Sequence, residues 1–202
     1  MTAMRRFTFI ALPLALLAFA PASSALAQEA ETASAEQTIP ATQAERLDGL
    51  FADLKRTSEE GAAKEISNRI RLEWQDSGSA TVNLLIQWAD KAMTEDKNTT
   101  ALDYLDEIVT LRPDYVEGWN RRATLHFKMG NFRKSMSDIN AVLELEPRHF
   151  GAIAGMAAIL STTGRDESAM EAWQRFLEIY PSERRAQKEY GDLVEKLAGQ
   201  RT

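Results

Sequence analysis

Cysteine is absent from this chain, and histidine occurs only twice. Without cysteine there is no disulfide scaffold, thiolate zinc site, iron–sulfur cluster or thiol nucleophile. The two histidines are isolated and form no His-x-x-x-His pair. We therefore expect structural roles for both and no metal site. His126 falls at an aromatic packing position between helices, and His149 falls at the start of a helix.

Motifs for catalysis are absent as well. The sequence contains no Gly-rich phosphate loop and no Gly-x-Ser-x-Gly elbow. It therefore predicts a protein that is not an enzyme, with no cofactor and no small-molecule substrate. Acidic residues (30) outnumber basic ones (24), for a net charge of −6, which argues against a nucleic-acid surface. The acidic run of Asp103, Asp106 and Glu107 is expected to be solvated.

Long apolar runs are missing except at the N-terminus. Arg5 and Arg6 precede the uncharged stretch 7–20, and Ala25-Leu26-Ala27 has the small-x-small pattern of a cleavage site. Residues 1–27 thus predict a secretory signal cleaved before Gln28, and an exported, periplasmic protein without stable membrane insertion. The apolar run is shorter than the roughly 20 residues of a spanning helix, although an uncleaved anchor stays open as the alternative.

Residues 28–43 follow as a leader of Ala, Thr, Ser, Glu and Gln with almost no large apolar side chain. Such a composition cannot bury enough apolar surface to offset the entropy lost on ordering. We expect a disordered, mildly acidic leader.

The rest of the chain repeats itself. Pro113, Pro147 and Pro181 are spaced 34 residues apart, and each follows a similar apolar stretch. Each block shows apolar residues at helical spacing twice, which predicts two amphipathic helices per block. Gly130 and Gly164 are expected in the interhelix turns, and each proline ends a second helix. The blocks are 82–115, 116–149 and 150–183.

Small residues recur in register at positions where helices must approach closely. They are Ala89, Ala123 and Ala157 at one offset, and Ala101, Ser135 and Ala169 twelve residues later. A single helix pair cannot bury its apolar faces, so stacked neighbours must share a core.

These residues resemble the tetratricopeptide repeat (TPR) family, most closely in the central block. The resemblance implies an all-α, right-handed solenoid of helix-turn-helix repeats. One departure recurs, because Ile108, Val142 and Phe176 stand where the family has a small residue. We expect these larger side chains to push neighbouring helices slightly apart. The central residues on the family pattern are Trp119, Ala123, Gly130, Phe132, Ser135, Ile139, Val142 and Pro147.

Two flanking segments are expected to complete the array. Residues 44–81 form a degenerate repeat followed by a loop, and residues 184–202 form a capping helix and tail, with Ser182 as the N-cap. All four tryptophans fall on apolar stripes, so we expect them to pack in the core.

The resemblance also implies a concave groove, lined by the first helix of each repeat, that binds a peptide or protein. The basic clamp that some members use for a carboxylate tail is not reproduced. Small residues in the third block either admit a bulky apolar ligand side chain or permit tight helix packing. The groove positions implied are Asn83, Ile86, Gln87 and Asp90 in the first block, Glu117, Asn120, Arg121, Thr124 and Lys128 in the second, Gly151, Ala154, Gly155 and Ala158 in the third, and Arg185, Lys188, Glu189 and Asp192 in the capping helix.

Two functions remain open at this stage. The first is an exported, non-catalytic adaptor or scaffold that binds its partner in the groove. The second is an accessory or regulatory subunit of an envelope enzyme or assembly complex, which docks through its convex or terminal surface. The sequence does not identify the partner or the oligomeric state.

Overall fold

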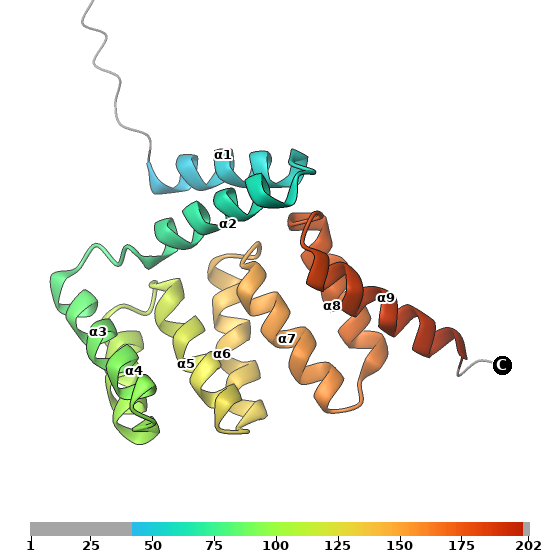
Figure 1. The fold of residues 1–202 in the computed structure, drawn as a ribbon. Helices are drawn as coiled ribbons and strands as arrows, with labels where there is room; N and C mark the ends of the chain where they lie inside the picture. Colours follow the sequence, from blue (N-terminus) through green and yellow to red (C-terminus); the bar gives the residue numbers. More distant parts are fainter. Residues whose placement is uncertain (1–41, 200–202) are drawn as a thin grey trace, which may run out of the picture. The chain divides into compact units, whose positions relative to one another are not determined.

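A computed structural model of the protein describes residues 42–199, and every regular element in this range is an α-helix. The predicted all-α class is confirmed. The predicted signal segment and most of the predicted leader lie outside the described residues. The helices are α1 Gln43–Arg56, α2 Glu60–Gln75, α3 Ala80–Thr94, α4 Asn98–Leu111, α5 Val116–Lys128, α6 Phe132–Leu145, α7 Phe150–Thr162, α8 Asp166–Ile179 and α9 Arg184–Gly199 (Figure 1).

Helices α3 to α8 form three successive helical hairpins, and α9 packs against α8. The tight turns of the second and third hairpins use Gly130 and Gly164, whose φ angles of 73° and 75° favour glycine. The first hairpin has no glycine there. Asp96 takes the left-handed conformation instead, with φ of 55°, which aspartate tolerates better than most residues.

Side-chain caps fix where several helices begin. Thr42 and Glu45 form a reciprocal capping box at the start of α1, and Ser79 caps α3. The expected cap of α9 by Ser182 is wrong. The longer side chain of Glu183 reaches the helix end and accepts a 2.6 Å hydrogen bond from the backbone N–H of Ala186. The Ser182 hydroxyl is buried without a hydrogen-bond partner in the described part of the chain.

The small residues of the repeat pattern are buried, as their spacing predicted. Ala89, Ala123 and Ala157 are at most 3% exposed. Ser135 donates a 2.8 Å hydrogen bond to the carbonyl of Ala123, which ties α6 to α5. The large Ile108 is accommodated by Gly118 on the next helix, where an added Cβ would stand 2.8 Å from its Cγ2.

The hairpin α1–α2 differs from the sequence expectation of a further stacked repeat. It lies across the ends of the later helices (Figure 1), and the elements it contacts include α8 and α5. Its apolar stripe, which contains Leu50, Leu54, Ile70 and Trp74, shares one core with residues of α7, α8 and α9. The first hairpin of the array therefore lacks the neighbour that the sequence assigned to it.

Contacts with the turn between α6 and α7 hold α1–α2 in this place. The Trp74 indole stacks on the His149 ring with centroids 4.0 Å apart. The Arg148 guanidinium lies 4.3 Å from the centroid of the Phe51 ring and pairs with Asp48 at 2.7 Å. A stacked repeat would need the stripe to face α3, whereas these partners direct it toward the inter-repeat turns.

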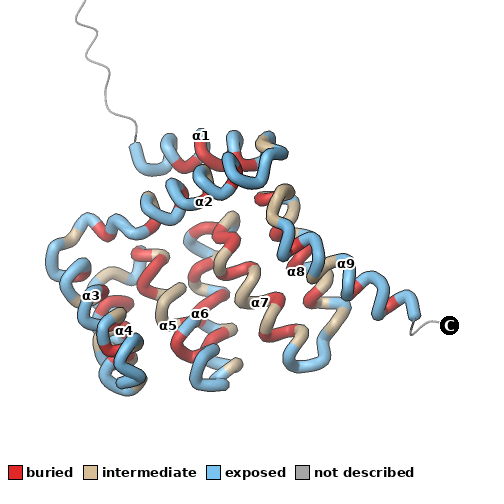
Figure 2. Tube along the Cα trace, in the orientation of Figure 1, coloured by how far each residue is buried: buried red, intermediate tan, exposed pale blue. Residues whose placement is uncertain are grey.

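One consequence is that α3 keeps an apolar outer surface. Leu84 and Trp88 are 43% and 45% exposed, so the prediction that every tryptophan packs in the core is wrong for Trp88. In a repeat array, the preceding repeat normally covers the side of the helix on which Leu84 and Trp88 lie. Trp74 and Trp173 are buried and Trp119 is half-buried, whereas α3 and α4 show long exposed stretches (Figure 2).

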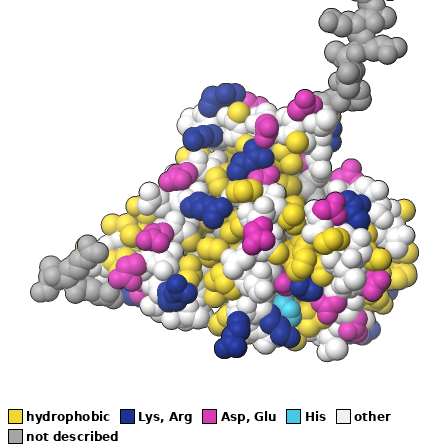
Figure 3. Space-filling view, turned by 180° about the vertical axis from the view of Figure 1, so that it is seen from behind, with side chains coloured by type: hydrophobic (Ala, Val, Ile, Leu, Met, Phe, Trp, Pro, Cys, Tyr) yellow, Lys and Arg dark blue, Asp and Glu magenta, His cyan; other side chains and the backbone are white. Residues whose placement is uncertain are grey.

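The surface carries charges of both signs. On the face opposite to that of Figure 1, basic and acidic side chains are interspersed around hydrophobic ones (Figure 3). Within residues 42–199, no cluster of acidic, histidine or cysteine side chains is arranged to hold a metal ion. None of the described helices is both long enough and apolar enough to cross a bilayer.

Candidate groove along the third repeat

The α7 helix presents a row of small residues to open space. Gly151, Ala154, Gly155 and Ala158 are half-buried. Two adjoining cavities share Gly151, Gly155 and Ala158 in their linings, and Ala154 lines the second of them. Tight packing does not require the glycine at position 155, because an added Cβ would lie 3.4 Å from Ile139 Cδ1, an ordinary contact. This geometry favours an open floor over close helix packing at that position.

The first cavity separates α7 from α5 and has a volume of about 150 Å³. Asn120, Thr124 and Phe127 of α5 line it opposite the small residues of α7. The structure thus brings together two groove residues of the second block with those of the third. It is an apolar slot with a single amide at its rim.

The second cavity lies on the other side of the same row, and its volume is about 530 Å³. Aromatic side chains of α7 and α8, Phe150, Trp173 and Phe176, form much of its lining together with Tyr180 just after α8. Residues of α2 line it as well, which follows from the position of the α1–α2 hairpin. These α2 residues were not expected at the groove, because the sequence pattern predicts α2 as part of a further stacked repeat.

The rim of this cavity holds cations that lack a counter-ion among the described residues. Lys64 and Arg185 form no ion pair within residues 42–199, and the Arg71 guanidinium lies 4.7 Å from the centroid of the Phe150 ring. The two carboxylates at the rim are engaged elsewhere. Glu60 pairs with Arg184 at 2.7 Å, and Glu183 caps α9. The rim can therefore receive negative charge from a ligand.

The signal that could have located these residues is their spacing. Lys64, Asn68 and Arg71 are four and three residues apart, which places them on one face of α2. That spacing predicts a shared polar face but cannot say which helix the face overlooks.

The predicted groove residues of the first block do not join these cavities. Ile86 is buried in the core around the first hairpin, and Asn83 accepts a 2.6 Å hydrogen bond from the Ser77 hydroxyl. Asp90 forms an ion pair with Arg121. Lys128 pairs with Asp96 in the preceding turn. The polar residues at this end of the array bind one another.

Arg121 is likewise already paired within the protein, so the expectation that it is available to a ligand is not supported. Besides Asp90, it lies 4.0 Å from Glu117. Glu117 is buried, accepts a 2.9 Å hydrogen bond from Asn120, and lies 3.6 Å from Nε2 of His149. Burial alone would raise the pKa of Glu117, but His149, Asn120 and Arg121 together hold that pKa below its ordinary value.

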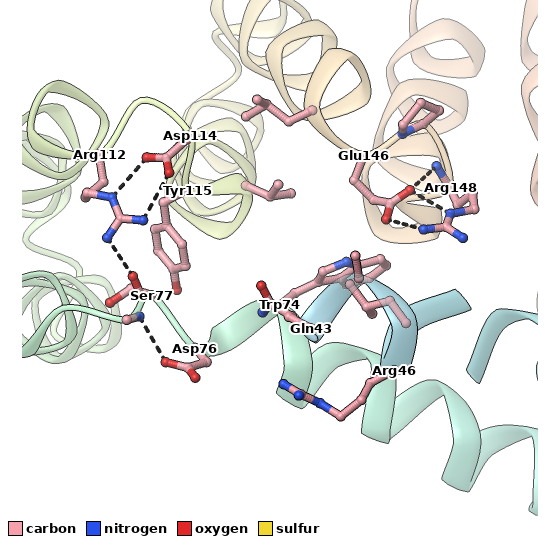
Figure 4. A pocket seen from close by; sticks show the side chains of 16 residues that line it. Gln43, Arg46, Trp74, Asp76, Ser77, Arg112, Asp114, Tyr115, Glu146 and Arg148 are labelled. Carbon is pink, nitrogen blue, oxygen red and sulfur yellow. Dashed lines mark hydrogen bonds and ion pairs between the residues drawn. The ribbon is translucent and has the colours of Figure 1, made fainter. Parts of the chain in front are cut away.

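A hollow of about 730 Å³ forms a seam between the α1–α2 hairpin and the inter-repeat turns (Figure 4). Its arginines are paired with carboxylates of the described residues. Arg112 donates two hydrogen bonds to the Asp114 carboxylate and a third to the carbonyl of Ser77 (Figure 4). Arg148 likewise donates two hydrogen bonds to the Glu146 carboxylate (Figure 4). Burial raises the pKa of Tyr115, whose hydroxyl donates to the Gln75 carbonyl, to about 12. The contacts across the seam attach the α1–α2 hairpin to the inter-repeat turns, and the cations of the seam are already neutralised.

Comparison with known proteins identifies a repeat family and a relative of full length. The family model of the tetratricopeptide repeat matches residues 116–149. A TPR repeat-containing protein of Rhizobium etli is 55% identical over 204 residues, which span all of this chain and all of that protein.

Solved structures of TPR domains resemble the fold. The first TPR of Spaghetti (RPAP3) bound to an HSP90 peptide has a TM-score of 0.55 at 22% identity and covers 58% of this chain and 93% of its own. The TPR2B domain of yeast Sti1 in complex with pHsp70 has a TM-score of 0.53 at 18% identity, over 58% and 99% of the two chains. The P58(IPK) TPR domain, at 0.53 and 20%, covers 76% of this chain and 45% of its own. At these identities the likeness concerns the fold alone.

Proposed function

The chain belongs to the tetratricopeptide-repeat family, and on this premise we propose that it is an exported, non-catalytic interaction module that holds a segment of a protein or peptide partner in the groove along α7. Two of the structurally similar TPR domains were solved with HSP90- or Hsp70-derived partners. The observation that carries the proposal is the open row of Gly151, Ala154, Gly155 and Ala158 between two lined cavities.

The lining indicates what kind of segment fits. Aromatic rings and small side chains form an apolar floor, which suits one or two large apolar side chains. Lys64 and Arg185 at the rim suit an acidic group next to them. We therefore propose a partner segment in which apolar anchors alternate with Asp or Glu. Arg185 is one of the groove positions that the resemblance implied, whereas Lys64 was not expected there and the pairing with an acidic group had been assigned to Arg121.

A substitution pair tests whether the groove binds. Ala154→Arg puts a long, charged side chain on the floor, so it should abolish partner capture from envelope material while the melting temperature changes little. Ala141→Arg is the matched control, because Ala141 is also half-buried but lies on α6, outside both cavities. Full capture by the Ala154 variant would favour an accessory subunit that docks through its convex or terminal surface.

The rim cations give a second, graded test. Replacing Lys64 and Arg185 together by Glu should weaken capture by about tenfold or more, because repulsion replaces attraction at two points. The loss should be smaller at high salt, since the side chains are exposed and screened. Unchanged capture at low salt would contradict the acidic character proposed for the partner.

Export is the other half of the proposal. The support is the apolar run 7–20 followed by Ala25-Leu26-Ala27. N-terminal sequencing of protein from the envelope fraction should begin at Gln28. Recovery of residues 1–20 from that fraction would instead indicate a retained anchor.

A further inference from the structure

The two ends of the repeat array differ in polarity. At the C-terminal end, α9 turns exposed residues such as Lys188, Asp192 and Glu195 outward, with Val194 at 41% exposure among them. This is the polar cap that a terminal repeat needs. At the other end, no described residue forms such a cap over α3 and α4, since the α1–α2 hairpin contributes its apolar stripe to the core of the third repeat.

The uncapped end carries a connected apolar strip. The Trp88 and Tyr104 rings are in contact, with centroids 5.7 Å apart, which joins the outer sides of α3 and α4. Leu84 lies one turn before Trp88, and Leu111 lies two turns after Tyr104. Leu84, Trp88 and Leu111 are 43%, 45% and 48% exposed. Large apolar side chains gathered in this way mark an interaction surface. We call this set the end strip.

Charged side chains of opposite sign flank the end strip. Lys91 lies one turn after Trp88 on α3, and Asp103 and Glu107 lie on α4 on either side of Tyr104 in sequence. None of the three forms an ion pair among the described residues. Helical periodicity places Lys91 at one edge of the strip and the two carboxylates at the other. A surface with an apolar centre, a positive edge and a negative edge is complementary to a second copy of itself.

We propose that the protein forms a two-fold symmetric dimer in which the end strips of two copies pack against each other. A two-fold axis parallel to α3 and α4 lays α3 of one copy over α4 of the other. The antiparallel hairpin and the Trp88–Tyr104 contact then bring Lys91 opposite the partner's Asp103. Such an isologous contact closes with two copies. Head-to-tail stacking would set the apolar strip against the polar face of α9, which lacks a matching apolar surface.

The area of the end strip sets the expected affinity of the dimer. Helices of 15 and 14 residues, each about 21 Å long and about 10 Å wide, give a face near the small end of specific interfaces. We expect a reversible dimer with a dissociation constant on the order of 1–100 μM. Dimerisation leaves the α7 groove open, so this inference does not depend on the proposed function.

Sedimentation equilibrium of the purified protein across that concentration range tests the dimer. Trp88→Glu should weaken association by about 100-fold or more, because it places a charge in the centre of the strip. Val194→Glu is the control at the opposite end, with similar exposure, and should leave association unchanged. A protein that stays monomeric at several hundred micromolar would overturn the proposal, and so would equal loss in both variants, which indicates head-to-tail contact.

A charge exchange tests the symmetry itself. Lys91→Glu and Asp103→Lys should each weaken the dimer by about three- to tenfold, and the double variant should recover, because each charge then meets its opposite across the axis. If the double variant instead loses dimer affinity by the sum of the two single effects, the proposed axis is overturned. Circular dichroism melts check that every variant remains folded, which is expected because all the substituted side chains are exposed.

Discussion

Small side chains in the described helices have two different purposes. Gly118 makes room for Ile108, since an added Cβ would stand 2.8 Å from its Cγ2. The sequence expectation that Ile108 pushes helices apart overlooked this compensation on the next helix. Gly155 instead borders open space and leaves the groove accessible. The two positions look alike in the sequence, because the sequence does not show which atoms surround a glycine in the folded protein.

Replacing Gly118 by Ala should therefore destabilise the protein. The overlap costs about 1–3 kcal/mol, which exceeds the gain of about 1 kcal/mol from alanine in a helix. Gly191→Ala in α9 is the matched control, because nothing lies within 4 Å of its added Cβ, and it should stabilise by up to about 1 kcal/mol. Urea unfolding measures both. An equal gain in the two variants would show that α4 and α5 are farther apart than described.

His126 is buried between helices at the predicted aromatic position, and its Nδ1 atom has no hydrogen-bond partner in the described residues. Burial lowers its pKa, with nearby Asp138 opposing the shift. Because the folded protein favours the neutral ring, stability is complete above about pH 6.5, the pKa of an unfolded histidine, and falls as the pH drops below it.

His126→Phe should remove this dependence. The variant should be more stable at pH 7 by about 1 kcal/mol, since an unpartnered buried polar atom is lost. Its advantage should widen between pH 7 and pH 5.5. Thermal melts over this range measure both effects, and parallel pH curves for the two proteins would contradict the assignment.

At the scale of elements, periodicity predicted where helices lie but not where α1 and α2 dock. Their apolar stripes are readable from Leu47, Leu50, Ala63 and Ile70. The surface that covers those stripes is chosen by contacts between distant residues, such as Trp74 with His149. No spacing rule connects such pairs, so the sequence placed this hairpin in the stack by analogy with the other repeats.

Trp74→Ala tests the docking of the hairpin. Trp74 is 5% exposed and contacts Phe51, His149 and Phe150. Its truncation should cost about 3–5 kcal/mol. Hydrogen exchange should show faster exchange in α1 and α2, while α5 and α6 keep their protection. Matching loss of protection in all four helices would mean that the hairpin and the repeats unfold as one unit.

At the scale of the whole described region, the sequence predicted the repeat period, the turns at Gly130 and Gly164 and the buried small residues. The sequence also predicted that the small residues of α7 and Asn120 belong to one groove. It could not foresee that Asp90 neutralises Arg121, because that pair joins two repeats through side-chain conformations. Nor could it foresee the rim cation Lys64, which reaches the groove only through the docked hairpin.

Site-specific photocrosslinking shows whether a partner segment lies in the groove along α7. A photoreactive amino acid is placed at Ala154 on the groove floor or at Ala141 on α6, in cells that make the protein. We predict a discrete adduct with another polypeptide from position 154, none from position 141, and loss of the adduct when Lys64 and Arg185 are replaced by Glu. An adduct from position 141 with none from position 154 would contradict the account.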